Sequence, residues 1–168
     1  MTTTLQTQRG HQLNALMFFF MLGMINPLHA QWVQTNGPYG GTVNCFAVSG
    51  TNIFAGTAGG LFLSMNNGTN WTQTGLTNIY VNALAVSGTN VFAGTYGGVF
   101  LSTNNGTSWT EVNNGLTNTS VNALAVSGTN IFAGTAGGVF LSMNNGTNWT
   151  QTGLTNIYVN ALAVSGVV

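Results

Sequence analysis

Side chains able to perform acid, base or nucleophilic chemistry are scarce in this sequence. Its 168 residues contain one cation, Arg9, one acid, Glu111, one cysteine, Cys45, and two histidines, His11 and His29. Glycoside hydrolysis in its general form needs two carboxylates that flank the scissile bond, and a serine or cysteine nucleophile needs a nearby general base. Because no such pair can be assembled after residue 30, the sequence predicts a protein that is not an enzyme.

The same scarcity bears on cofactors and partners. After residue 30 the sequence offers too few His, Cys and carboxylate side chains for a metal site, so we expect no metal and no cofactor. Nucleic-acid binding recruits basic residues, which disfavours nucleic acid as a partner. Glu111 is expected to be solvated, as most acids are. Cys45 is expected to be a small buried residue, because alanine takes its place in the repeats described below.

Recognition of an uncharged ligand remains, and tyrosines are the candidates for it. Antiparallel strand order is expected to place all four tyrosines on one face of the fold derived below. A ring with a polar tip, surrounded by Asn and Thr, suits an uncharged glycan or protein surface. The alternative is that the rings only pack against neighbouring loops. The candidate binding residues are Tyr39, Tyr80, Tyr96 and Tyr158.

Residues 1–30 have the three parts of a secretory signal peptide. Arg9 gives a positive start, residues 15–25 form an apolar run, and Leu28 and Ala30 stand at the positions that a signal peptidase reads. We expect cleavage after Ala30 and a secreted or periplasmic protein with no membrane span after cleavage. A membrane-spanning helix is the weaker interpretation, because crossing a bilayer takes about 20 apolar residues.

An internal repeat organises the rest of the chain. The phrase VNALAVSG, or VNCFAVSG in its first copy, recurs at spacings of 38, 40 and 38 residues. Residues 43–80 and 121–158 differ at only three positions. The copies of the phrase begin at Val43, Val81, Val121 and Val159.

Each repeat divides into four short extended segments that are separated by Gly and Asn turns. Within 81–120 the β-branched and aromatic runs predict strands at 81–86, 90–95, 98–102 and 109–112. The first of them is apolar on both faces, as expected of a strand buried between neighbouring sheets. The fourth is more polar and is expected at an outer edge.

Four strands in about 40 residues is the length of a β-propeller blade. The predicted fold is therefore all-β: an incomplete propeller of about three and a half four-stranded antiparallel blades, covering residues 31–168. A β-solenoid is the alternative, although its coils are usually shorter. The expected blades are 43–80, 81–120 and 121–158, with single strands at 31–35 and 159–165.

A corner phrase joins the third and fourth strands of every unit. Its Asn-Gly pair supplies the positive φ angles of a tight turn, and its Trp covers the hairpin. The phrase resembles the Asp-box, or bacterial neuraminidase repeat, of sialidase-like propellers, with Asn where that family usually has Asp. The matching residues are Ser64, Asn66, Gly68 and Trp71, then Ser102, Asn104, Gly106 and Trp109, and finally Ser142, Asn144, Gly146 and Trp149.

The wider unit, FAGTYGGVFLSTNNGTSW, resembles secreted bacterial propellers of the photosystem II stability and assembly factor type. Both resemblances imply a propeller fold in which the box is a structural turn. Sialidases hold their substrate with an arginine triad, and this chain has no arginine after Arg9. We therefore expect a secreted non-catalytic module for binding or scaffolding. The alternatives are a fragment of a sialidase-like glycan-processing enzyme and a structural repeat protein that self-associates through open strand edges.

Overall fold

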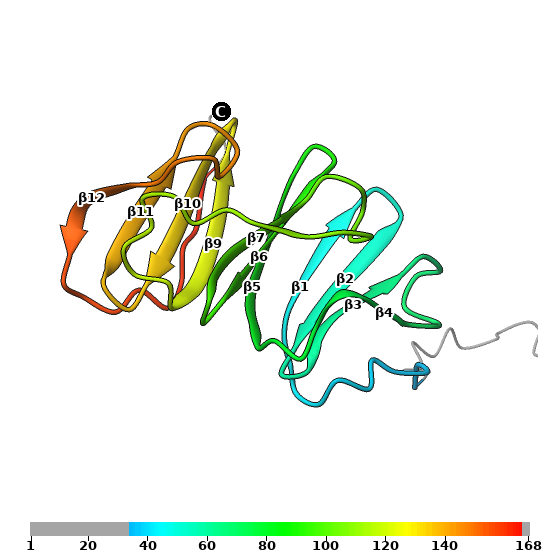
Figure 1. Cartoon of the computed structure of the whole chain (residues 1–168). Coiled ribbons are helices and arrows are strands. Elements are labelled where there is room, and N and C mark those ends of the chain that lie inside the picture. Colours follow the sequence, from blue (N-terminus) through cyan, green and yellow to red (C-terminus); the bar gives the residue numbers. More distant parts are fainter. Residues whose placement is uncertain (1–33, 166–168) are drawn as a thin grey trace, which may run out of the picture. The chain divides into compact units, whose positions relative to one another are not determined.

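The computed structural model describes residues 34–165, and within that range β-strands are the regular elements. They form three antiparallel sheets of four strands, each in chain order (Figure 1). The predicted signal peptide and its cleavage site lie outside the described residues. The described residues include no helix that could cross a membrane. The first sheet holds β1 (Val43–Ser49), β2 (Asn52–Thr57), β3 (Gly60–Ser64) and β4 (Thr72–Thr77); the second holds β5 (Val81–Ser87), β6 (Asn90–Thr95), β7 (Gly98–Ser102) and β8 (Thr110–Glu111); the third holds β9 (Val121–Ser127), β10 (Asn130–Thr135), β11 (Gly138–Ser142) and β12 (Thr150–Thr155).

Short turns connect the first three strands of every sheet. Between β1 and β2, Gly50 has a φ of 61°, a left-handed conformation that glycine adopts at low steric cost. Between β2 and β3, the buried Thr57 hydroxyl donates to the Gly60 carbonyl at 2.8 Å and accepts from the Gly59 N–H at 3.1 Å. These local interactions are repeated in each unit, so each hairpin is specified by its own residues.

The strands predicted in the second unit are confirmed for the first three, but the fourth is shorter than expected. The sequence predicts a strand over 109–112, whereas β8 covers only Thr110–Glu111. The Asn113 side chain explains the difference: its Oδ1 accepts from the Val99 N–H at 2.8 Å and its Nδ2 donates to the Gly97 carbonyl at 2.9 Å. The first of these bonds occupies the Val99 N–H of β7, which a longer β8 would otherwise use.

Of the two predicted single strands, the one at 159–165 is not found, and the one at 31–35 lies mostly outside the described residues. Residues 31–33 lie outside the described residues; Thr35 is not in a strand, and Asn36 forms one isolated parallel bridge with Asn70. Residues 159–165 belong to no sheet, although the Val159 N–H donates to the Thr135 carbonyl at 3.0 Å. The prediction of a strand at 159–165 was wrong because a strand needs a continuous hydrogen-bonded neighbour, and this segment has none among the described residues. The strand at 31–35 stays a prediction.

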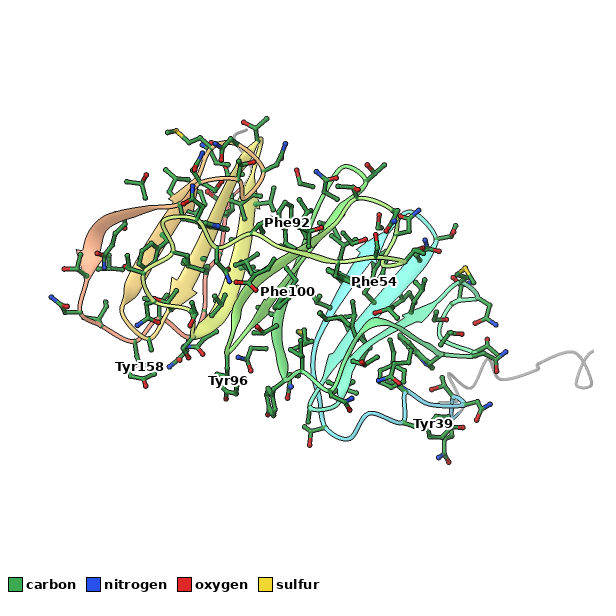
Figure 2. All side chains as sticks on the ribbon, in the orientation of Figure 1. Tyr39, Phe54, Phe92, Tyr96, Phe100 and Tyr158 are labelled. Atoms are coloured by element: carbon green, nitrogen blue, oxygen red, sulfur yellow. The ribbon has the colours of Figure 1, made fainter. Side chains whose placement is uncertain are left out.

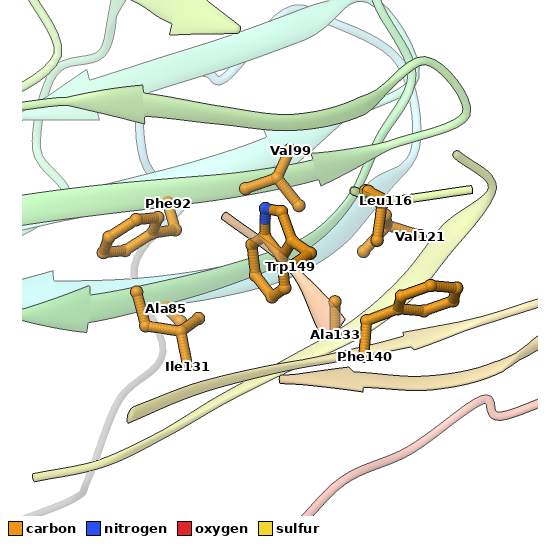
Figure 3. Close-up of a cluster of buried hydrophobic side chains, with 9 residues drawn as sticks. All are labelled: Ala85, Phe92, Val99, Leu116, Val121, Ile131, Ala133, Phe140 and Trp149. Carbon is orange, nitrogen blue, oxygen red and sulfur yellow. The ribbon is translucent and has the colours of Figure 1, made fainter. Parts of the chain in front are cut away.

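Apolar side chains fill the two junctions between consecutive sheets. At the first junction Phe54 and Leu61 of the first sheet pack with Val81 and Val91 of the second. Figure 2 shows Phe54 and Phe92 inside the unit, and both are fully buried. Figure 3 shows the second junction, with the Trp149 ring in the middle of the group. That cluster contains Ala85, Phe92, Val99, Leu116, Val121, Ile131, Ala133, Phe140 and Trp149.

The strand β5 is buried on both faces, as predicted. Ala85 belongs to the second junction, whereas Leu84 and Val86 pack against the first. The inner strands β1, β5 and β9 contact one another in that order. Three four-stranded antiparallel sheets that pack face to face along their inner strands are the blades of an incomplete β-propeller, and this arrangement excludes the solenoid.

Glycines in the second strands allow the sheets to approach closely. A Cβ atom at Gly56 would lie 2.7 Å from Val81 Cγ1, and one at Gly94 would lie 2.6 Å from Val121 Cγ1. The first valine of each inner strand therefore sits in a notch on the preceding sheet, and any larger residue would fill that notch. The same notch at Gly134 holds Val159, with a corresponding distance of 2.7 Å.

Candidate binding face

All four predicted tyrosines have solvent-exposed rings. Tyr39 is 74% exposed, Tyr80 38%, Tyr96 59% and Tyr158 72%. Figure 2 shows Tyr39, Tyr96 and Tyr158 along the lower side of the view. This is the side that carries the turns between second and third strands and the connections between blades. The rings are therefore exposed to solvent on one side of the three-bladed fold.

Tyr80 and Tyr96 lie together. Their ring centroids are 5.3 Å apart and the planes are inclined by 37°, within the range of distances at which aromatic pairs attract. The Tyr80 hydroxyl donates to Asn44 Oδ1 at 3.3 Å. These two residues come from the connection between the first two blades and from the turn after β6. The pair is thus an exposed aromatic patch with one fixed hydroxyl.

Tyr39 and Tyr158 do not join this pair. The Tyr39 hydroxyl bonds to Asn36 Oδ1, and in the described part of the chain Tyr158 forms no aromatic pair. The four predicted residues therefore share a side of the unit but do not form one cluster. The candidate site narrows to Tyr80, Tyr96 and the asparagine that holds Tyr80.

Asparagines in the inner strands link the blades, a role that the sequence reasoning missed. Asn44 Nδ2 donates to the Val81 carbonyl at 3.0 Å, and Asn82 Nδ2 donates to the Val121 carbonyl at 3.0 Å. Each bond joins one blade to the next. The available signal was the recurrence of Asn as the second residue of every VNALAVSG copy. Asn44 therefore both links two blades and positions the Tyr80 hydroxyl.

The corner phrase forms a hydrogen-bonded turn around its serine. The Ser102 hydroxyl accepts from the Gly106 N–H at 2.8 Å and donates to Asn104 Oδ1 at 3.0 Å. Asn104 Oδ1 also accepts from the Ser108 N–H at 2.9 Å. Asn105 and Gly106 have φ values of 54° and 82°, which confirms the predicted positive φ angles. The asparagine oxygen is an acceptor in this corner, and these bonds do not need the negative charge of the Asp that the Asp-box usually has.

The other two corners repeat this geometry. Ser64 accepts from Gly68 N–H, and Ser142 accepts from Gly146 N–H, both at 2.8 Å. Ser64 also donates to Asn66, and Ser142 to Asn144, both at 3.0 Å. Each corner thus provides hydrogen-bond acceptors for its own backbone N–H groups. The residues predicted to match the Asp-box therefore form structural turns.

The tryptophans that follow the corners differ in their hydrogen bonds. Trp109 Nε1 donates to the Gly106 carbonyl of its own corner at 3.1 Å. Trp149 Nε1 donates to the Val112 carbonyl of the preceding blade at 2.7 Å. Trp149 therefore fastens the third blade to the second, whereas Trp109 closes its own hairpin.

Glu111 is the only Asp, Glu, Lys, Arg or His residue among the described residues. It lies exposed on β8, and Glu111 Oε1 accepts from Asn113 Nδ2 at 2.7 Å. Residues 34–165 include no group of three or more His, Cys, Asp and Glu side chains close enough to hold a metal ion. The amide of Asn113 thus holds this carboxylate at the outer strand.

Cys45 is a partly buried free thiol at the first junction between blades. Burial raises the pKa of its thiol to about 11, and the hydrogen bond with the Gly56 backbone only partly opposes that rise. A thiol with a raised pKa is mostly protonated at neutral pH and is a poor nucleophile. Its environment agrees with the packing role expected from the alanines at the same repeat position.

This raised pKa makes the stability of the fold sensitive to alkaline pH. The unfolded thiol loses its proton at about pH 9 and the folded one at about pH 11, so stability is retained below pH 9 and falls as the pH rises toward 11. Between pH 8 and pH 11 we expect the native chain to lose on the order of 1–2 kcal/mol more than Cys45→Ala. Urea unfolding followed by circular dichroism measures both proteins, and equal losses would contradict the prediction.

The sequence matches no protein-family model, and no curated protein matches it significantly. Solved structures, in contrast, resemble the fold. The computationally designed Ika4 protein aligns with a TM-score of 0.66 and 15% identity, over 80% of this chain and 87% of the designed one. An ancestral GH74 enzyme aligns with a TM-score of 0.62 and 22% identity, over 72% of this chain. The structure of YCF48 bound to a D1 peptide aligns with a TM-score of 0.59 and 14% identity, over 73% of this chain.

These similarities establish the β-propeller fold. The chain spans 20% of the length of the GH74 enzyme and 43% of that of YCF48. At such identities the likeness concerns the fold alone, and the ligands of these proteins are not transferred by it.

Proposed function

We propose that this chain is an exported, non-catalytic β-propeller module that binds an uncharged glycan through Tyr80 and Tyr96, with an uncharged protein surface as the alternative ligand. The observation that carries the proposal is the exposed ring pair, 5.3 Å between centroids, whose Tyr80 hydroxyl is held by Asn44. Export to the periplasm or the extracellular space is proposed from the signal-peptide pattern of residues 1–30.

The chemistry of this pair suits a neutral ligand. Two adjacent rings provide an apolar surface on which a sugar ring or a flat side chain can stack, and the hydroxyl groups at their edge can exchange hydrogen bonds with it. The pair is fixed to the boundary between two blades, so less side-chain freedom is lost on binding. Because charged residues make up only 1% of the sequence, binding is expected to depend little on salt.

The non-catalytic part of the proposal is supported by the position of Glu111. Glu111 lies on β8 and its carboxylate accepts a hydrogen bond from Asn113, whereas the two tyrosines lie elsewhere, next to β5 and β6. We propose that the corners are Asp-box turns with Asn in place of Asp, which keeps the acceptor oxygen and serves the fold. The ancestral GH74 enzyme shares the fold, whereas its catalysis is not proposed for this chain.

An array of uncharged oligosaccharides tests the proposed ligand class. We expect binding by the native chain and at least a tenfold loss for the double variant Tyr80→Ala/Tyr96→Ala, the equivalent of about 1.4 kcal/mol. The double variant Tyr39→Ala/Tyr158→Ala is the matched control, because it removes two exposed rings that do not belong to the pair. It is expected to bind like the native chain.

Three outcomes separate the alternatives. Loss of binding in the paired variant alone supports the proposal. Equal loss in both double variants would show that the whole tyrosine side contributes and would reject the pair as the site. No binding to any oligosaccharide by the native chain would reject the glycan and leave an uncharged protein surface as the ligand to be tested.

A further inference from the structure

The first and third blades each expose an apolar face. In other blades the residues at the same repeat positions are packed against a neighbouring blade. On the first blade, Phe46 is 59% exposed and Val48 is 62% exposed. At the same repeat positions in the second blade, Leu84 and Val86 pack against the first blade. In the other blades this surface faces the preceding blade. We call the surface of the first blade that carries Phe46 and Val48 its rear face.

The opposite side of the third blade, its front face, is open in the complementary way. Leu154 is 49% exposed, whereas its repeat equivalents Leu76 and Leu116 are 3% and 5% exposed. A Cβ atom at Gly75 would lie 3.2 Å from the Thr107 carbonyl oxygen of the next blade, whereas one at Gly153 would meet nothing within 4 Å. The same residues are thus covered in the first blade and uncovered in the third.

Two unsatisfied polar groups lie one on each of these faces. Among residues 34–165, the buried side-chain nitrogens without a hydrogen-bond partner are Trp71 Nε1 and Asn122 Nδ2. The equivalents of Asn122 donate to the first carbonyl of the next blade. Of the two equivalents of Trp71, Trp149 donates to the preceding blade and Trp109 to its own corner. A buried polar group without a partner costs free energy, so both faces gain from a neighbouring blade.

We propose that the chain binds a second copy of itself head to tail, with the rear face of one copy packed on the front face of the other. The contact continues the interface that already joins the first blade to the second. It can do so because residues 43–80 and 121–158 differ only at Cys45/Ala123, Phe46/Leu124 and Leu61/Val139, which are all apolar. In this contact Asn122 Nδ2 donates to Val43 of the second copy, as Asn44 does to Val81.

Two copies with three blades each make six blades, a number within the usual four to eight of a closed propeller. The contact requires two segments to move. Residues 35–41 lie against the rear face, where Gly40 is close to Phe62. Residues 159–165 lie on the front face, with Val159 in the notch at Gly134 and residues 162–165 beside Ala125 and Phe132. Neither segment belongs to a sheet and neither covers the exposed residues named above, so a complete blade replaces them with a larger buried area.

Sedimentation velocity of the purified chain at several concentrations tests this proposal. We expect a monomer–dimer equilibrium, which Gly153→Arg on the front face and Phe46→Arg on the rear face each weaken by about 100-fold or more, because a charge would be buried without a partner. Thr129→Arg is the matched control: it adds the same charge to a turn whose equivalents, Thr51 and Thr89, are exposed in the other blades. It is expected to dimerise like the native chain.

Mixing the two arginine variants tests the head-to-tail geometry. Gly153→Arg retains a native rear face and Phe46→Arg retains a native front face, so the mixed pair has one native contact and one that carries both substitutions. An equimolar mixture is therefore expected to form a one-to-one dimer through the native contact, although neither variant does so alone. Far-UV circular dichroism checks that each variant is folded; Gly153 has room for a side chain in the monomer. A chain that ends at Tyr158 is expected to associate more tightly, because one displaced segment is removed.

A native chain that stays monomeric at all concentrations would overturn the proposal. So would a dimer that both face variants retain, or a mixture that stays monomeric, since both results place the contact elsewhere. Unchanged affinity in the chain that ends at Tyr158 would show that residues 159–165 are not displaced and would reject this docking mode. The inference is independent of the glycan proposal, because neither Tyr80 nor Tyr96 takes part in it.

Discussion

Replacing Trp149 by alanine is expected to destabilise the chain by about 3–5 kcal/mol, the range measured for large aromatic residues in protein cores. The ring is 4% exposed and lies in the middle of the cluster at the second junction. Its Nε1 also donates to the Val112 carbonyl at 2.7 Å, so the substitution leaves a carbonyl of the second blade without its partner. Urea unfolding followed by far-UV circular dichroism measures the change.

Trp71→Ala is the matched control for this prediction. Trp71 occupies the same position in an almost identical repeat, but it is only half-buried and its Nε1 has no partner among the described residues. We expect about half the loss of Trp149→Ala or less. Equal losses would show that the tryptophans act only within their own hairpins and that the bond to Val112 contributes little.

Gly115→Ala is expected to cost about 3 kcal/mol or more, the sum of backbone strain and overpacking. Gly115 has a φ of 84°, and a Cβ atom there would collide with the Trp149 carbonyl oxygen in the next blade. Because the obstacle is backbone, it cannot be relieved by a change of rotamer. The second junction must open or the loop after β8 must move, and the same unfolding measurement detects either change.

Gly128→Ala separates the strain from the collision. Gly128 has a φ of 60°, but a Cβ atom there would meet nothing within 4 Å. The expected cost is therefore about 1 kcal/mol, from the left-handed conformation alone. If both glycine variants lost the same stability, the close approach of the loop to the third blade would not matter for folding.

The sequence was most informative where structure is local. The Asn-Gly pairs predicted the corners because positive φ is a property of those residues, and Asn105 and Gly106 adopt it. The inner strand β5 could be predicted as buried on both faces because both of its alternating sets of side chains are apolar. The repeat length of about 40 residues then predicted a propeller blade, because a four-stranded unit of that size must pack against copies of itself.

Interactions between parts distant in the sequence were not predictable in the same way. The short β8 depends on the Asn113 amide competing for hydrogen bonds of β7, and composition does not reveal that competition. The proximity of Tyr80 and Tyr96 depends on how a connection and a turn approach each other at the edge of two blades. Spacing placed both on one side of the fold, but it could not show that they, and not Tyr39 or Tyr158, form a pair.

The notch that receives the first valine of each inner strand has a consequence for how the chain reaches its native state. Gly56, Gly94 and Gly134 form equivalent notches, and the valines that enter them begin almost identical phrases. Side-chain complementarity therefore hardly distinguishes a correct neighbour from an incorrect one. Which notch a valine enters therefore depends on the length of the chain segment that joins the two blades. Refolding at high concentration consequently favours exchange of hairpins between molecules, a characteristic failure of repeat proteins.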